Sequence, residues 1–152
     1  MSKKCCFAGH SKIYNSDEIY IKLLACIENL ITKEDVSVFW VGNYGRFDAL
    51  AAKAVQNLKT KYPHITLELV IPYLTKEIDE NKEYYYQSYD HILIADISQN
   101  TPKRFYISKC NEYMIDKSDF IICYVKNSWG GASKTLDYAK RKNYIVILNL
   151  AY

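Results

Sequence analysis

The stretch NSWGGASKTLDYAKRK, residues 127–142, decides the fold of this chain. It follows an apolar run at 120–125, which is typical of a buried strand, and it continues into a segment with the spacing of a helix. A strand that meets a helix through a short turn is the repeating unit of a parallel α/β sheet. The adjacent glycines Gly130 and Gly131 leave two alternatives open. They form a tight turn, or they let the backbone approach a phosphate.

The same alternation runs along the whole chain. Short apolar runs indicate strands at 5–9, 36–41, 65–71, 92–95, 119–125 and 144–148. Helical spacing of apolar residues indicates helices at 16–31, 47–61, 103–116 and from the glycine pair onward. Between them lies a polar, tyrosine-rich stretch at 73–90. The pattern predicts one domain over residues 1–152, with an α/β fold, a doubly wound and mostly parallel sheet, and helices on both faces.

The composition limits the classes of binding partner that we expect. The net charge of +3 permits anionic ligands but is not the dense basic footprint of a nucleic-acid binder, so nucleic acid is not an expected partner. No apolar run approaches the ~18 residues of a membrane span, and no signal-peptide core follows the first residues, so we expect no membrane partner.

The cysteines and histidines point away from disulfides and metals. The five cysteines lack a Cys-x-x-Cys pair and mostly lie in apolar runs, which predicts reduced, buried thiols in a cytoplasmic protein. No two histidines, and no histidine–cysteine pair, have metal-ligand spacing. We therefore expect neither a metal nor another cofactor.

Ligands of parallel α/β sheets bind at the carboxyl ends of the strands, so the strand-to-helix junctions are the places to search. Three junctions carry glycines and polar residues. The candidate ligand-binding residues there are Gly9 and His10; Gly42, Asn43, Tyr44, Gly45 and Asp48; and Gly130, Gly131, Ser133, Lys134 and Thr135.

At the third junction, the start of the following helix adds partial positive charge worth roughly 0.3–1 kcal/mol to an anion. Ser133 and Thr135 either cap this helix or donate to a phosphate, and Lys134 adds charge. The alternative is a glycine turn before an ordinary capped helix.

The remaining candidates are single side chains. Asp48 is placed to accept a hydrogen bond from a ribose hydroxyl, or simply favours the dipole of its helix. His10, at a strand end, is more often structural than catalytic. Asn111 is a polar candidate directed toward the strand ends, while Asp119 satisfies the backbone at a turn or substitutes for a missing catalytic acid. The tyrosines at 84–89 either stack on a base or form a lid or a dimer surface.

Four segments together resemble the SLOG superfamily, the Rossmann-like group that contains the Smf/DprA and LOG proteins, and in particular its small YpsA-like branch. They are CCFAGH, VGNYGRFDALAAKA, MIDKSDFIICYV and GGASKTLDYAKRK with the closing strand YIVILNL. The resemblance implies a Rossmann-like fold whose glycine loops bind nucleotides or nucleotide-derived, ADP-ribose-like ligands. It also implies a homodimer or a higher homo-oligomer.

The chain departs from the catalytic members of that superfamily. LOG-type phosphoribohydrolases carry Pro-Gly-Gly-x-Gly-Thr-x-x-Glu and an upstream Arg-Lys pair. Cys110 and Asn111 stand where the pair would be, Trp129 replaces the proline, and Tyr138 replaces the glutamate. The departures favour a non-catalytic sensor or sequestering protein, with no catalytic residue assigned. An N-glycosidase or phosphoribohydrolase acting on nucleoside monophosphates is the alternative.

Overall fold

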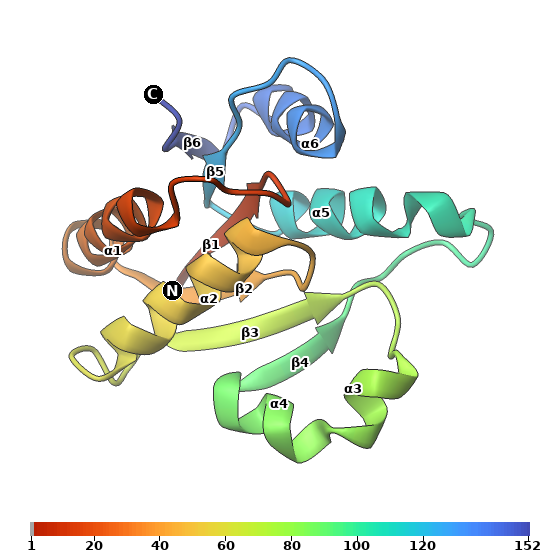
Figure 1. The fold of residues 1–152 in the computed structure, drawn as a ribbon, viewed down its shortest axis with the longest axis horizontal. Helices are drawn as coiled ribbons and strands as arrows, with labels where there is room; N and C mark the ends of the chain where they lie inside the picture. Colours follow the sequence, from red (N-terminus) through yellow and green to blue (C-terminus); the bar gives the residue numbers. More distant parts are fainter. Residues whose placement is uncertain (1) are drawn as a thin grey trace.

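A computed structural model describes residues 2–152 as one α/β unit (Figure 1). Its strands are β1 (Lys3–Gly9), β2 (Val36–Val41), β3 (Thr66–Ile71), β4 (His91–Ile94), β5 (Phe120–Tyr124) and β6 (Val146–Asn149). Its helices are α1 (Ser16–Lys33), α2 (Arg46–Lys59), α3 (Lys76–Glu80), α4 (Lys82–Ser88), α5 (Tyr106–Asp116) and α6 (Gly131–Lys140), with a 3-10 turn, η1 (Lys103–Phe105), before α5.

The six strands form one sheet in the order β4-β3-β2-β1-β5-β6. Every neighbouring pair is parallel, so the sheet is fully parallel rather than mostly parallel. The order runs outward in one direction from β1 to β4 and in the other direction through β5 to β6. The chain therefore reverses its winding between β1 and β5, and the loops that follow these two strands diverge there. Such a switch point is where parallel α/β sheets bind ligands.

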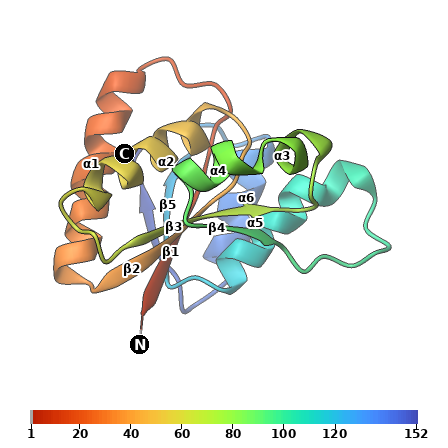
Figure 2. The ribbon, with the colours of Figure 1, turned by 90° about the horizontal axis from the view of Figure 1, so that it is seen from below.

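Helices lie on both faces of the sheet (Figure 2). Cys5 and Phe7 pack with α1 and α2, whereas Cys6 and Ala8 pack with α5 and α6. This alternation explains why the strands are apolar on both faces: a parallel sheet covered by helices on each side has no wet face. The predicted doubly wound α/β fold is confirmed.

The sequence pattern predicts no helix or strand in the tyrosine-rich stretch at 73–90, but the structure has helices there. It forms the short helices α3 and α4, which cover Leu69 and Ile71 at the β3 end of the sheet through Ile78 and Tyr85. Thr75 caps α3 by accepting the Ile78 N–H at 3.2 Å. Helices this short give too few turns for a periodic apolar pattern, so they leave little signal in the sequence.

Within residues 2–152, no helix combines the length and the apolar character needed to cross a bilayer.

Candidate functional site

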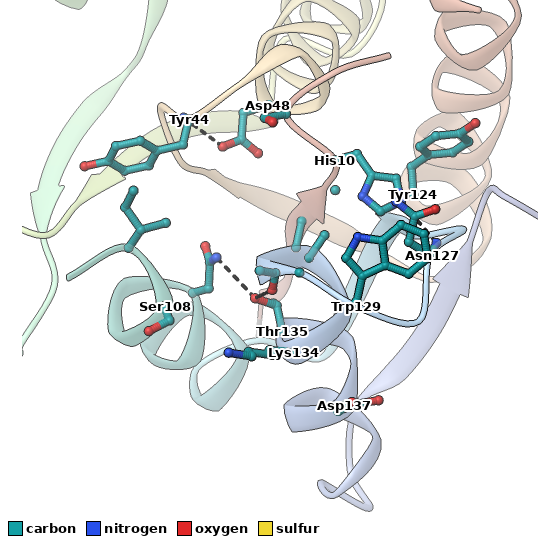
Figure 3. Close-up of a pocket in the computed structure, with 18 of the residues that line it drawn as sticks. His10, Tyr44, Asp48, Ser108, Tyr124, Asn127, Trp129, Lys134, Thr135 and Asp137 are labelled. Carbon is teal, nitrogen blue, oxygen red and sulfur yellow. Dashed lines mark hydrogen bonds between the residues drawn. The ribbon is translucent and has the colours of Figure 1, made fainter. Parts of the chain in front are cut away.

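A cleft of about 1340 Å³ lies at the switch point, above the carboxyl ends of β1 and β5 (Figure 3). Its walls come from the loops after these strands, from the loop after β2, and from the beginnings of α5 and α6. These segments are far apart in the sequence and meet because parallel strands end at the same edge of the sheet. The three junctions that the sequence singles out therefore converge on one site.

Nine of the predicted ligand-binding residues line this cleft: Gly9, His10, Tyr44, Asp48, Asn111, Gly130, Gly131, Lys134 and Thr135. Gly42, Asn43 and Gly45 lie beside it in the loop after β2, and Ser133 is buried on the far side of the first turn of α6.

Asp119 lies at the opposite edge of the sheet, at the amino end of β5. Its carboxylate accepts the Lys4 N–H at 2.9 Å, and its own N–H donates to the carbonyl of Lys4 at 2.8 Å. The sequence hypothesis that Asp119 serves the ligand thus fails on position, because a residue before a strand and a residue after it lie a full strand length apart.

Gly130 and Gly131 form an open start to α6. Gly130 has φ +92°, a conformation that side chains rarely adopt, and no side chain caps the helix. No protein atom lies within 4 Å of the position that a Cβ would take on either glycine. The first helical N–H groups have no intrahelical partner, so this helix start presents donors and partial positive charge to the cleft.

The other glycines are required by packing. A Cβ on Gly9 would stand 2.5 Å from Cγ of the Phe47 ring, and a Cβ on Gly45 would stand 2.5 Å from the Cα of Ser11. The first N–H of α2, that of Arg46, donates to the carbonyl of Ser11 at 2.8 Å, so the protein itself occupies the space before this helix. Of the glycine junctions, the one at α6 is left open to a ligand.

Thr135 organises this open turn from below. Its hydroxyl donates to the carbonyl of Gly131 at 3.0 Å and accepts from the Asn111 amide at 3.3 Å. The hydroxyl proton is therefore engaged with the protein, and Thr135 and Asn111 position the helix start instead of offering a free donor.

His10 fixes the other end of the glycine loop. Its Nε2 accepts the N–H of Lys126 at 2.9 Å, and its ring packs edge-on against Tyr124. Because Nε2 is the acceptor, the neutral ring carries its proton on Nδ1. Burial, and then the charge of Lys126, lowers the pKa of His10 below its ordinary value, which favours this neutral form. The geometry therefore supports a structural role for His10 and not a catalytic one.

Asp48 is a half-buried acid of the cleft. One of its carboxyl oxygens accepts the Tyr44 N–H at 3.0 Å. Burial raises the pKa of Asp48 to about 7, against the lowering effect of that hydrogen bond. Near neutral pH, the group therefore exchanges between its charged and neutral forms.

Positive charge gathers at the cleft although the whole chain is only mildly basic. Six basic side chains line it, against three acids, Asp48, Glu112 and Asp137; the basic residues are Lys12, Arg104, Lys109, Lys126, Lys134 and Arg141. Arg104 lies in the 3-10 turn before α5. It precedes Cys110 and Asn111, the positions that correspond to the Arg-Lys pair of the hydrolases. In the sequence, Arg104 is visible only as part of the Lys-Arg pair at 103–104. Its spacing from the glycine pair does not indicate that the two lie together in the fold.

Trp129 is the aromatic residue that the sequence analysis noted only as a departure from a motif. It lines the cleft directly before the glycine pair, and 70% of its surface is exposed. An indole in this position is available for stacking. The tyrosines at 84–89 do not line the cleft, and Tyr85 is buried against β3 instead.

The thiols are not poised for chemistry. Cys5, Cys6, Cys110 and Cys123 are buried, and burial raises the pKa of Cys110 to about 12. Among residues 2–152, no group of three His, Cys, Asp or Glu side chains is arranged to hold a metal ion.

Two relatives are similar in sequence. The uncharacterized SPbeta prophage-derived protein YoqJ of Bacillus subtilis is 35% identical over 137 residues, covering 79% of each chain. The UPF0398 protein BH1768 of Halalkalibacterium halodurans is 29% identical over 127 residues, which cover 80% of this chain and 65% of that protein.

Two solved structures share the fold. DNA processing protein A (DprA) from Streptococcus pneumoniae superposes with a TM-score of 0.63 at 16% identity, over 92% of this chain and 47% of that one. DprA from Helicobacter pylori gives a TM-score of 0.63 at 15% identity, over 95% of this chain and 64% of that one. The chain thus spans less than two thirds of either structure.

The Helicobacter pylori protein binds single-stranded DNA. The prediction that nucleic acid is not an expected partner is therefore wrong, because a chain built on this fold serves as a DNA-binding protein. The prediction considered only the net charge of the chain, whereas six basic side chains lie together at one cleft.

Family membership follows from the length of the match. The family model described as the YspA SLOG family (YpsA) matches residues 11–147. This range contains the second and third glycine junctions completely and begins directly after Gly9 and His10 of the first. The parallel sheet, its switch point and the open glycine turn agree with that assignment, and the chain belongs to the YpsA family of the SLOG superfamily.

Proposed function

We propose that the protein binds a nucleotide-derived ligand in this cleft and holds a ligand phosphate at the start of α6. One observation carries the proposal: the glycine pair opens an uncapped helix start into the cleft, with no protein atom within 4 Å of either Cβ position. Backbone donors at such a turn, together with the helix dipole, form an anion site without needing a single dominant charged residue.

The surroundings favour a nucleotide over a simple anion. Arg104 lines the cleft from the 3-10 turn η1 and Lys134 lines it from α6, and Trp129 offers an exposed ring beside the phosphate position. A phosphate clamp beside a stacking surface matches a phosphorylated nucleoside, because the base supplies an aromatic face. We further propose that the protein retains this ligand as a sensor or sequestering protein, since the glutamate and the Arg-Lys pair of the related hydrolases are absent in register.

Single-stranded nucleic acid is a second candidate. The cleft volume of about 1340 Å³ exceeds the ~300–1,000 Å³ that is usual for small-molecule sites. Tyr14, Phe105 and Trp129 line the cleft as partly or fully exposed rings, and basic side chains surround them. Stacking rings beside basic side chains are the recurring features of sites that bind single strands.

Calorimetric titration separates these candidates. The probes are inorganic phosphate, AMP, ADP, ADP-ribose and deoxythymidine oligonucleotides of increasing length. A mononucleotide or dinucleotide ligand saturates one site, and longer oligonucleotides gain nothing over it. A nucleic-acid ligand gains affinity with length and loses it steeply with salt. If none of these probes binds, the proposed function is wrong.

A further inference from the structure

The Asp48 carboxyl is held on one side and free on the other. The oxygen that accepts the Tyr44 N–H also lies 3.0 Å from the position that a Cβ would take on Gly42, so a larger residue there would press on this carboxyl. Within residues 2–152, Tyr44 N–H is the one donor to this carboxyl, and no cationic side chain pairs with it. The second oxygen is left to the cleft that Asp48 lines (Figure 3).

A half-buried carboxyl with one hydrogen bond and no counter-charge costs folding free energy, which is a mark of a functional position. Its charge would repel a phosphate, so it suits a part of the ligand that donates hydrogen bonds. In a nucleotide, the sugar hydroxyls are such donors, and they are attached close to the phosphate. A carboxylate is a strong acceptor for them.

We propose that Asp48 accepts a hydrogen bond from a ribose hydroxyl and that the ligand is therefore a ribonucleotide and not a deoxyribonucleotide. This inference rests on the proposed function, because it needs a nucleotide phosphate at the start of α6. It makes Asp48 a specificity-determining residue, whereas the glycine pair supplies affinity without reading the sugar.

The preference for ribose depends on pH in a defined direction. The pKa of Asp48 is raised to about 7 by burial, so the stronger acceptor, the carboxylate, accumulates as the pH rises through neutrality. The titratable groups packed around it do not change charge there. Burial raises the pKa of Tyr44 and of Tyr89 above their ordinary values and that of Cys110 to about 12.

The other titratable groups at the cleft change charge below Asp48 or lie apart from it. His10 has a pKa lowered by burial and by Lys126, so its charge changes at a lower pH than that of Asp48. Glu112 and Asp137 lie on α5 and α6 rather than against Asp48. Asp48 is thus the group that we expect to set the pH response.

The test measures the dissociation constants of ADP, 2′-deoxy-ADP and 3′-deoxy-ADP at pH 6.0 and pH 8.5. The probes share the base and the diphosphate, so the ratio of constants cancels phosphate ionisation and isolates the hydroxyl. The wild-type protein should prefer ADP over at least one deoxy analogue by about tenfold or more at pH 8.5, and less at pH 6.0. Asp48→Asn should lower this preference and remove its pH dependence. Glu34→Gln, which removes an exposed acid outside the cleft, should leave both unchanged.

Equal binding of ADP and both deoxy analogues by the wild-type protein at pH 8.5 overturns the inference, and this arm does not depend on any variant folding. A ribose preference that is undiminished in Asp48→Asn and keeps its pH dependence overturns it as well, since another group would then bind the hydroxyl. If AMP, ADP and ADP-ribose all fail to bind the folded protein, the proposed nucleotide site is wrong, and the ribose assignment is wrong with it.

Discussion

The Nε2 atom of His10 accepts the backbone N–H of Lys126 at 2.9 Å. This bond joins the loop after β1 to the loop that carries the glycine pair, across the switch point of the sheet. The two loops belong to halves of the chain that wind in opposite directions. The His10 N–H donates to the Tyr124 carbonyl at 3.2 Å, so the histidine side chain extends the pairing of β1 with β5 beyond the strand ends and into the cleft wall.

Replacing His10 by Ala should cost about 0.5–1.5 kcal/mol of unfolding free energy, because the Lys126 N–H loses its acceptor. It should also weaken ADP binding, since the glycine loop is no longer anchored. Urea denaturation and calorimetry measure the two effects. His64→Ala, an exposed histidine outside the cleft, is the control.

The His10 contribution should also respond to pH. Its folded pKa lies below the unfolded value, so its stabilising effect is complete above pH ~6.5 and is lost as the pH falls through the folded pKa. The stability difference between wild type and His10→Ala should therefore shrink on acidification. A difference that stays constant from pH 8 to pH 5 would contradict the neutral-ring assignment.

Gly45 and Gly130 offer a matched pair. Both precede a helix with nearly the same backbone, φ +91° and φ +92°, a region that costs other residues roughly 1–3 kcal/mol. Only Gly45 faces a neighbour, the Ser11 backbone at 2.5 Å from the Cβ position. Gly45→Ala should therefore lower the midpoint of thermal unfolding more than Gly130→Ala. Equal shifts would mean that the Ser11 contact relaxes without cost.

At Gly131, stability and binding should move in opposite directions. Alanine fits the open space and has the higher helix propensity, so Gly131→Ala should raise the free energy of unfolding by up to ~1 kcal/mol. The same methyl group should weaken ADP binding by occupying the path to the backbone donors. Thermal unfolding and calorimetric titration of the same preparation test the expected gain in stability and the expected loss of ADP affinity.

Gly131→Glu extends this test. It should abolish ADP binding through bulk and like charge while the fold survives, because no protein atom lies within 4 Å of the new Cβ. Lys134→Ala should cost less affinity, since an exposed lysine contributes a screened charge. Unchanged affinity in Gly131→Glu would show that the glycine pair is only a turn.

Most of the fold could be predicted because its signals are local. The central strands are apolar on both faces, and the helices that cover them repeat their apolar residues over three or more turns, as α2 does through Leu50, Ala54 and Leu58. The end of β2 at Val41 is marked by the following glycine. The short helices α3 and α4 could not be predicted, because their contacts with Leu69 and Ile71 are tertiary.

The site residues could be predicted only where they lie in the strand-to-helix junctions. Gly130, Gly131 and Asp48 follow strand ends, so topology alone brings them together. Arg104 and Trp129 have no periodic or spacing signal, and their place in the cleft depends on the path of the segment before α5 and of the loop after β5. Asp119 was placed correctly at the beginning of a strand, and of its two predicted roles the structure supports the backbone role, because its carboxylate accepts the Lys4 N–H.

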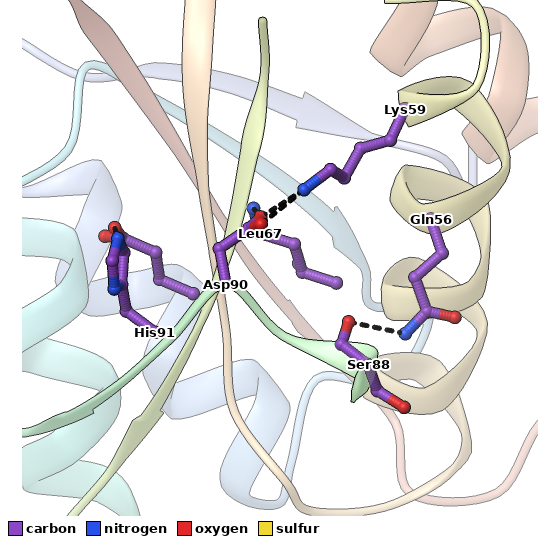
Figure 4. Close-up of polar contacts among 7 residues, drawn as sticks. Gln56, Lys59, Leu67, Ser88, Asp90 and His91 are labelled. Atoms are coloured by element: carbon purple, nitrogen blue, oxygen red, sulfur yellow. Dashed lines mark hydrogen bonds and ion pairs between the residues drawn. The ribbon is translucent and has the colours of Figure 1, made fainter. Parts of the chain in front are cut away.

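Asp90 ties α2 to the edge of the sheet (Figure 4). Its carboxylate accepts both Lys59 Nζ and, at 2.7 Å, the Leu67 N–H. Partial burial alone would raise the pKa of Asp90, but these hydrogen bonds outweigh it and lower the pKa below its ordinary value. Asp90→Asn should cost about 1.5–3 kcal/mol of unfolding free energy at pH 7.

The sign of the pH effect follows from the lowered pKa. The stabilising contribution of Asp90 is present above pH ~4 and is lost as the pH falls through the folded value. Acid denaturation followed by circular dichroism should show the wild type and Asp90→Asn converging below that pH. Glu80→Gln, which breaks an exposed pair with Lys76, is the control and should change little. A gap between wild type and Asp90→Asn that persists at pH 2 would contradict the role of the ionised carboxylate.

The last prediction is that the protein releases no base from AMP, GMP, CMP or UMP. Glycosidic cleavage usually needs two carboxyl groups, one as acid and one as base or nucleophile. Asp48 and Glu112 are both half-buried acids of the cleft, but Glu112 pairs with Lys109 at 3.2 Å. Tyr138, in the glutamate position, donates its hydroxyl to Asp116 at 2.7 Å. Overnight incubation followed by chromatography of free base measures turnover. Base release that disappears in Asp48→Asn would show that the single carboxyl, held beside a ribose, suffices for the reaction.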